Sequence, residues 1–311
     1  RRMLGMLAVA LYSFREGVRD GGLHGVLGLA LSVLLFTLAL AELALDQKRR
    51  VVQDIGLSSI SLFSVIMAVF LGSSLLYKEI ERKTLYVILP KPIRRHEFLL
   101  GKYFGIVLTV GVFVLIMGAV QLCVSSFQLV GPSWQLMAAI PLLLVLLGVA
   151  MYFARDRTAV VVPWSAAALA LTSLMGWQLG VALWPILAQL LLTMGEVLVL
   201  CAVALLFSAF STPFLTALFT TGVWLVGRSA DVMVQVKGKL LPDVLKALLQ
   251  KLVRVWPNFN LFVPGQHTLG AKLDDLSGPL GYVLSSMTYA ALYSALLLVF
   301  AAFIFRKRDF L

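Results

Sequence analysis

Residues 55–77 read IGLSSISLFSVIMAVFLGSSLLY, and this stretch carries no charged side chain. An α-helix needs about 20 apolar residues to cross the ~30 Å hydrocarbon core of a membrane. The whole chain has the same character, because 60% of its 311 residues are hydrophobic and only 13% are charged. Soluble proteins carry roughly a quarter charged residues, and disordered chains are poor in apolar ones. The sequence therefore predicts an all-α polytopic membrane protein.

Outward from residues 55–77, the same reasoning predicts about eight transmembrane helices. Only four charged residues lie between residues 103 and 227, and the breaks between apolar stretches contain Gly, Pro and Ser. The expected spans are residues 26–45, 55–77, 103–126, 136–153, 158–177, 184–207, 212–227 and 281–305. One alternative stays open: because Pro141 lies in a short span, residues 136–177 form either two full crossings or a re-entrant hairpin.

Two segments are predicted to lie at the membrane surface. Residues 1–22 are expected to form an amphipathic interfacial helix, because apolar side chains recur there at helical spacing, at Leu4, Leu7, Leu11 and Phe14. Residues 23–311 form the transmembrane domain. Within it, the polar loop 228–280 contains a second amphipathic helix, Asp243–Val255, which is expected to act as an external gate or as an interfacial anchor.

The net charge of +11 is interpreted as a topology signal. Basic residues of membrane proteins gather in cytosolic loops near anionic lipid, so nucleic acid is not an expected partner. An even number of spans puts both termini on one side. Placing that side in the cytosol agrees best with Arg306, Lys307 and Arg308, which directly follow the last span, and puts residues 228–280 outside. A count of seven spans would place this loop inside.

The sequence contains no local signature of an enzyme. It has neither a Gly-x-x-x-x-Gly-Lys-Ser/Thr phosphate-binding loop nor a Gly-x-Ser-x-Gly nucleophile turn. The three histidines are scattered without metal-ligand spacing, and Cys123 and Cys201 lie in apolar stretches that do not indicate a disulfide framework. We therefore expect a chain that is not an enzyme and that holds no metal or cofactor of its own.

Several small or polar side chains inside the spans predict helix packing. Ser61, Ser64, Ala68 and Gly72 share one side of their helix, which favours close approach of a neighbour. Two Gly-x-x-x-Gly matches, Gly101/Gly105 and Gly176/Gly180, are weak indicators in a chain with 24 glycines.

Glu196 is the most unusual of the intramembrane residues. An isolated charge at mid-span costs at least ~2.5–3.5 kcal/mol, so Glu196 must be protonated, paired or exposed to a polar cavity. Two interpretations stay open for Glu196, Gln121 and Gln189: they line a pathway, or they form interhelical hydrogen bonds, which is the favoured interpretation. Arg228, at the end of its span, is expected to extend its guanidinium toward the membrane surface.

The segment 78–102 is the most charged part of the chain. Its first residues are expected to continue the preceding helix, since Glu79 and Lys83 form an i,i+4 pair in the favourable order. Pro90 and Pro92 then break that helix. Apolar side chains among the charges favour a rigid elbow that a partner protein could bind, although a solvated cytosolic loop accounts for the same pattern.

The string LLYKEIERKTLYVILPKPIRRHEFLLGKYFG, residues 75–105, closely resembles the cytosolic segment of type-2 ABC exporter permeases. It is most similar to the branch of multicopper-enzyme-maturation-type permeases, which includes the nitrous-oxide-reductase maturation permease. The resemblance extends to ALYSFREGVRD, ALLFSAFSTPFLTALF, WPNFNLF and FRKRDF. Residues 128–180 depart from the six-span pattern of this family, so they are expected to be an inserted helical hairpin.

This resemblance implies the transmembrane subunit of an ATP-binding cassette exporter in a bacterial inner (cytoplasmic) membrane. Two copies of the chain, among membrane lipids, form the translocation pathway, and a separate ATP-binding protein that carries ATP and Mg²⁺ docks on each. An accessory extracytoplasmic protein is compatible with this arrangement. The helix 1–22 matches the family's elbow helix. The residues that match its coupling helix, within the cytosolic coupling segment 78–102, are Glu79, Glu81, Arg82, Lys83, Thr84 and Leu85.

Two other functions stay open beside this one. The chain could anchor an ATPase as a membrane scaffold without moving any substrate, or it could be an ion-coupled carrier that uses Glu196. The sequence does not identify a substrate.

Overall fold

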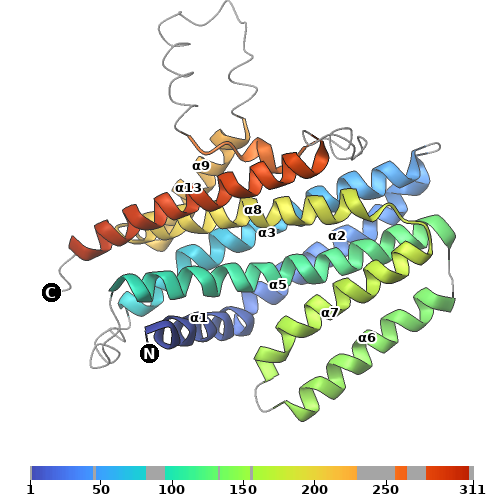
Figure 1. Ribbon diagram of the computed structural model, residues 1–311, viewed down its shortest axis with the longest axis horizontal. Helices are drawn as coiled ribbons and strands as arrows, with labels where there is room; N and C mark the ends of the chain where they lie inside the picture. Colours follow the sequence, from blue (N-terminus) through green and yellow to red (C-terminus); the bar gives the residue numbers. More distant parts are fainter. Residues whose placement is uncertain are drawn as a thin grey trace, which may run out of the picture.

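The computed structural model describes residues 2–44, 47–81, 95–131, 134–154, 157–229, 256–264 and 278–307, and these residues form helices and no strand. Figure 1 shows long helices lying side by side in one elongated bundle. The helices are α1 (Arg2–Arg19), α2 (Gly21–Leu43), α3 (Lys48–Glu81), α5 (Arg95–Val130), α6 (Trp134–Phe153), α7 (Arg157–Gln178), α8 (Leu183–Ser208), α9 (Pro213–Arg228), the 3₁₀ helix η1 (Phe259–Phe262) and α13 (Pro279–Lys307).

Among the described residues, six helices are long and apolar enough to cross a membrane: α2, α3, α5, α7, α8 and α13. This agrees with a multi-pass membrane protein. The two other expected spans correspond to α6, which has 20 residues, and to α9, which has 16. Because neither is among the six, the count of eight spans stays a prediction.

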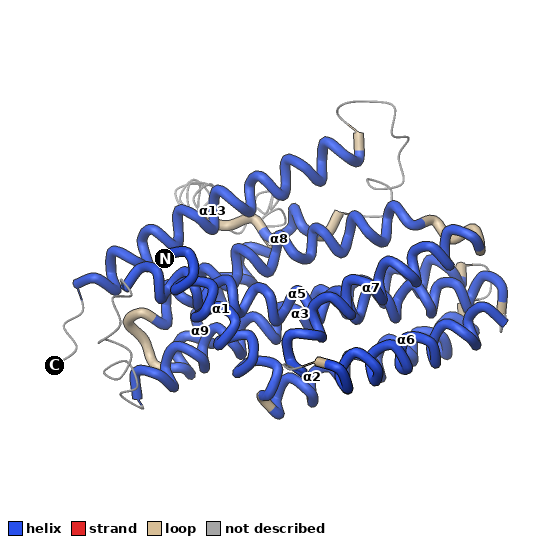
Figure 2. Tube along the Cα trace, turned by 60° about the horizontal axis from the view of Figure 1, so that its bottom comes forward, coloured by secondary structure: helices blue, strands red, loops and turns tan. Residues whose placement is uncertain are grey.

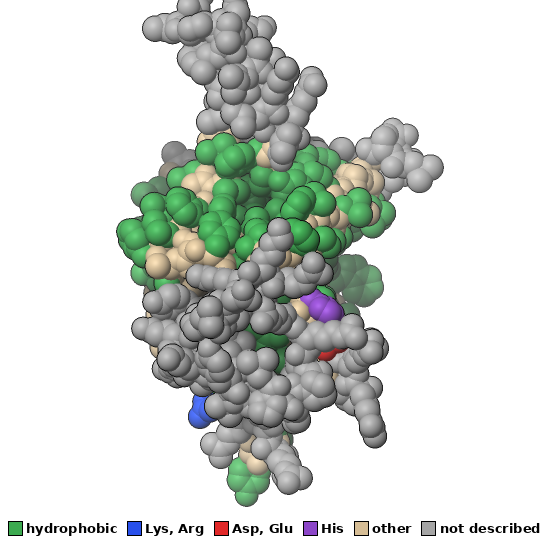
Figure 3. Space-filling model, turned by 90° about the vertical axis from the view of Figure 1, so that its left-hand side faces the viewer, with side chains coloured by type: hydrophobic (Ala, Val, Ile, Leu, Met, Phe, Trp, Pro, Cys, Tyr) green, Lys and Arg blue, Asp and Glu red, His purple; other side chains and the backbone are tan. Residues whose placement is uncertain are grey.

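α3 and α5 are much longer than a membrane crossing requires. They contain 34 and 36 residues, or about 51 and 54 Å at 1.5 Å per residue, against ~30 Å of hydrocarbon. α3 ends and α5 begins at the end of the bundle where both chain termini lie (Figure 1). Figure 3 looks onto this end, where hydrophobic side chains cover the upper part and charged ones are visible lower down.

α3, α5 and α8 form the centre of the bundle. Ser61, Ser64 and Ala68 are buried along one side of α3. At Gly72 a Cβ atom would lie 2.5 Å from the Cβ of Ala204, so only glycine permits this approach of α3 to α8. The predicted packing side of residues 55–77 is thereby confirmed, and its partner is α8.

α1 packs along the first turns of α5. A Cβ atom at Gly101 would lie 2.7 Å from the Cβ of Val9, and one at Gly105 would lie 2.5 Å from the Cβ of Ser13 and 2.7 Å from the carbonyl oxygen of Ala10. The Gly-x-x-x-Gly match at Gly101 and Gly105 is therefore where α1 packs on α5. In the sequence alone, this match was only a weak indicator of helix packing. The interfacial position of residues 1–22 stays a prediction.

Only part of the apolar face that the sequence predicts for α1 packs against the bundle. Phe14 is fully buried against the protein, whereas Leu7 and Leu11 are 52% and 43% exposed. The helix thus presents some apolar side chains to the bundle and others to its surroundings.

Residues 128–180, which the sequence predicts to be an inserted hairpin, include α6 and α7, and these two helices pack against each other at the edge of the bundle (Figures 1 and 2). α7 ends in a tight turn, where Gly180 adopts a left-handed φ of 80° and the amide of Val181 donates to the carbonyl oxygen of Gly176 at 2.8 Å. Glycine favours this conformation because it lacks a Cβ atom. The turn directs the chain into α8.

We predict that Gly105→Ala weakens the docking of α1. The added Cβ would overlap backbone and side-chain atoms of α1, and such overpacking costs ~1–3 kcal/mol, more than the up to ~1 kcal/mol that alanine adds to helix propensity. Hydrogen–deuterium exchange of the α1 amides measures the effect. The control is Gly28→Ala in α2, where nothing lies within 4 Å of the added atom. Equal protection of α1 in both variants would contradict the prediction.

Candidate functional site

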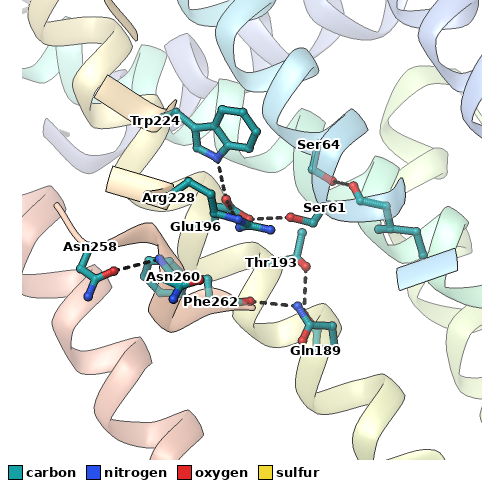
Figure 4. A network of polar contacts seen from close by, with 11 residues as sticks. Ser61, Ser64, Gln189, Thr193, Glu196, Trp224, Arg228, Asn258, Asn260 and Phe262 are labelled. Carbon is teal, nitrogen blue, oxygen red and sulfur yellow. Dashed lines mark hydrogen bonds and ion pairs between the residues drawn. The ribbon is translucent and has the colours of Figure 1, made fainter. Parts of the chain in front are cut away.

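Glu196 lies in the middle of α8 and is fully buried. Its Oε2 accepts a hydrogen bond from Ser61 Oγ of α3 at 2.7 Å. Its Oε1 accepts one from Trp224 Nε1 of α9 at 2.7 Å and one from Arg228 Nη1 at 3.2 Å. Figure 4 shows these side chains converging on the carboxylate from two neighbouring helices. One side chain therefore joins α3, α8 and α9.

Arg228 directs its guanidinium onto the carboxylate of Glu196. The Arg228 side chain is 28% exposed and pairs with Glu196 at 3.2 Å, with its guanidinium carbon 5.9 Å from the centroid of the Trp224 ring. A carboxylate inside a membrane is far less costly when a guanidinium balances its charge and neutral donors satisfy its oxygens. Of the three possibilities for Glu196, the structure shows pairing, and its partner Arg228 lies 32 positions away in the sequence.

A short segment, residues 256–264, which contains the 3₁₀ helix η1, packs beside this network. Phe259 and Phe262 are fully buried. The amide of Asn258 donates to the Tyr289 hydroxyl at 3.1 Å, and the side chain of Asn258 accepts from the amide of Asn260 at 2.9 Å, which caps η1. These residues belong to the polar loop 228–280, and nothing in their sequence predicted this burial.

Side chains of the surrounding helices satisfy the backbone of this region. Gln189 of α8 donates to the carbonyl oxygen of Phe262 at 2.9 Å, and Tyr282 of α13 donates to that of Leu261 at 2.7 Å (Figure 4 shows the first). Non-helical backbone is tolerated at membrane depth only where protein or a cavity provides such partners. Gln189 therefore acts here as an interhelical donor.

Two glycines let the segment approach the helices. At Gly195 of α8 a Cβ atom would lie 2.8 Å from Cε1 of Phe262, and at Gly227 of α9 it would overlap the carbonyl oxygen of Pro257 and lie 2.6 Å from Cδ2 of Phe259. α9 ends beside Glu196, and η1 packs against α8 from Gln189 to Gly195. α9 and residues 256–264 thus both pack along α8.

The other predicted residues lie elsewhere. Gln121 of α5 donates to the carbonyl oxygen of Val52 at 3.1 Å and links α5 to the start of α3, apart from the Glu196 network. The backbone of Glu79 and Glu81 forms the last turn of α3. The side chains of these two glutamates and the rest of the predicted coupling helix lie outside the described residues, as does the predicted helix Asp243–Val255.

Lys102 is a buried cation that the sequence analysis did not single out. It is fully buried, and its Nζ lies 3.6 Å from Oε2 of Glu16 in α1. The same nitrogen lies 5.9 Å from the ring centroid of Tyr12 and 6.0 Å from that of Phe98. These contacts join α1 to α5 at the end of the bundle where α3 ends. The position of Lys102 next to an apolar span could have indicated that it pairs with an acidic side chain. The sequence does not indicate that this side chain is Glu16.

Among the residues that the structure describes, no group of three or more His, Cys, Asp or Glu side chains could hold a metal ion. Both cysteines are free. In the part of the chain that the structure describes, hydrogen bonds and ion pairs such as Glu196–Arg228 and Glu16–Lys102 join the helices. No protein-family model and no curated protein matches this chain.

We predict that Glu196→Gln destabilises the bundle, because it leaves Arg228 without its counter-charge. The loss of unfolding free energy should be on the order of 2 kcal/mol, below the ~3–5 kcal/mol of a fully buried pair, since Arg228 stays 28% exposed. Thermal unfolding in detergent measures it. Removing both charges, in Glu196→Gln with Arg228→Gln, should restore part of the loss. A double variant less stable than the single one would refute the pairing.

A second expected outcome concerns residues 256–264. Gly227→Ala should displace Pro257 and Phe259 from α9, because the added atom overlaps both. Limited proteolysis within residues 256–264 should become faster. Gly222→Ala, on the same helix with nothing within 4 Å of the new atom, is the matched control. If both variants are cut at the wild-type rate, the packing described here is wrong.

Proposed function

We propose that this chain is the transmembrane subunit of an ATP-binding cassette exporter, working as a homodimer in a bacterial inner membrane with separate ATPase subunits. One observation carries the proposal. The string that resembles the cytosolic coupling segment of type-2 exporter permeases begins in the last turns of α3 and ends in the first turns of α5. Both helices extend beyond a membrane crossing, and they meet this segment at the end of the bundle that holds both termini (Figure 1).

The contacts of α3 and α5 support a mechanical role. In the proposed mechanism, closure of the ATPase subunits on ATP pushes the segment 78–102. α1 follows α5, because Gly101 and Gly105 seat it and Lys102 pairs with Glu16. α3 passes the movement to α8 and α9 through Ser61 and Glu196. Rigid movement of long packed helices is the usual way in which such transporters alternate access.

Glu196 favours a second candidate, the ion-coupled carrier, because ionisable residues inside spans commonly mark proton or ion pathways. The two functions make different demands on this side chain. In the exporter, Glu196 holds helices together, so Glu196→Gln combined with Arg228→Gln should retain ATP-driven transport. In the carrier, loss of the carboxylate should abolish transport while any associated ATPase continues to hydrolyse ATP. The substrate is not assigned.

The test of the exporter proposal is binding to an ATPase. The gene neighbouring this one should encode a Walker-motif ATPase, which is co-expressed with the chain and recovered by affinity purification. Glu79→Arg and Leu85→Asp should each release that ATPase, because they reverse a charge or bury one at the contact. The matched control is Asp54→Arg, an exposed position near the opposite end of α3.

Three outcomes separate the functions. Release by the first two variants but not by Asp54→Arg supports the exporter. Retention of the ATPase by all variants would show that residues 78–102 are not the contact. Retention in the wild type without any transport or substrate-stimulated hydrolysis would identify a membrane scaffold.

A further inference from the structure

A cavity of about 270 Å³ opens between α5 and the inserted hairpin. It exists because α6 packs mainly against α7 and touches α5 little. Small side chains, Ala119 and Cys123 of α5 and Ala168 of α7, leave the space between the helices unfilled, and Leu143 and Trp164 form its other walls. The cavity is therefore a product of residues 128–180, the part of the chain that departs from the family pattern.

A second hollow, of about 340 Å³, continues the first toward one end of the hairpin. Leu143 and Thr172 line both, so the two hollows adjoin, and together they are here called the hairpin groove. It follows α7 from Trp164 to Gln178, which corresponds to about 21 Å at 1.5 Å per residue. That length exceeds one leaflet, half of the ~30 Å hydrocarbon core.

The deep part of the hairpin groove offers no free polar group to a ligand. Trp164 Nε1 donates to the carbonyl oxygen of Leu143 at 3.0 Å, and Thr172 Oγ1 donates to that of Ala168 at 2.9 Å. The other lining side chains are apolar or, at Cys123, a thiol. A polar molecule placed there would lose its hydrogen bonds to water without replacement. The occupant must be hydrocarbon at this depth.

The mouth of the hairpin groove has the opposite character. Gln178 and Trp134 line it, and the Trp134 indole is 77% exposed. This end of α6 and α7 lies opposite the chain termini (Figure 1). Tryptophan is enriched at the membrane–water boundary, where it contacts headgroups. The groove thus runs from a polar, aromatic mouth to an apolar interior.

We propose that the hairpin groove binds one acyl chain of a membrane phospholipid, with the headgroup at Trp134 and Gln178 and the end of the chain beside Trp164. The gradient from a polar mouth to an apolar interior matches such a molecule and no polar one. The bound lipid fills the space between α5 and α6 and so completes the packing of the hairpin. This site is independent of the ATPase contact and of the Glu196 network.

The test measures lipid retention by the full-length protein. The protein is purified in detergent from membranes, and bound lipid is counted by native mass spectrometry. The wild type should retain one phospholipid per chain. Ala168→Leu fills the groove and should lower retention about tenfold, which corresponds to about 1.4 kcal/mol. Ala167→Leu, the next residue of the same helix, is exposed outside the groove and should retain lipid as the wild type does.

A second measurement locates the lipid. A phospholipid with a photoreactive diazirine on its acyl chain should label peptides around Cys123 and Ala168. If Ala168→Leu does not fold, Ala119→Leu fills the groove from α5 and provides the same comparison. Equal retention by the filled and control variants, labelling confined to other faces, or retention of free fatty acid in place of phospholipid would each overturn the proposal.

Discussion

The architecture depends on one constraint: a polar group inside the hydrocarbon of a membrane needs a protein partner, because no water is available there. The Glu196 carboxylate meets this requirement with donors from α3 and α9. The carbonyl oxygens of residues 261 and 262 meet it with side chains of α13 and α8. These hydrogen bonds fix how the short helix α9 and residues 256–264 pack. Apolar packing alone would allow several arrangements, and the polar contacts select one of them.

Glycine residues are the second determinant of the helix packing, because they allow neighbouring backbones to approach closely. Gly72 brings α3 to α8, Gly101 and Gly105 seat α1, and Gly227 admits residues 256–264. Interfaces between membrane helices rely on such close contact because lipid and protein side chains are equally apolar. Where small residues face one another without filling the space between helices, as at Ala119 and Ala168, a cavity remains.

Much of this fold could be predicted from uncharged stretches of the right length, which locate the long helices well. The serine side of α3 was also predictable, because its residues share a helical face. The partner of Glu196 was not, because Arg228 is distant in sequence and its position at a span end favoured an orientation toward the membrane surface. Nor was the burial of residues 256–264, since prolines and asparagines are typical of loops and only contacts with three helices explain their position.

The seat of α1 on α5 also has a consequence for biosynthesis. Residues 101–109 are synthesised after α1, α2 and α3, so at ~5–20 residues per second α1 waits on the order of 5 to 20 seconds before its partner leaves the ribosome. During this interval the side chains of α1 that later pack on α5 lack that partner. Leu7 and Leu11, which stay exposed in the folded chain, suit the helix to that earlier stage of assembly.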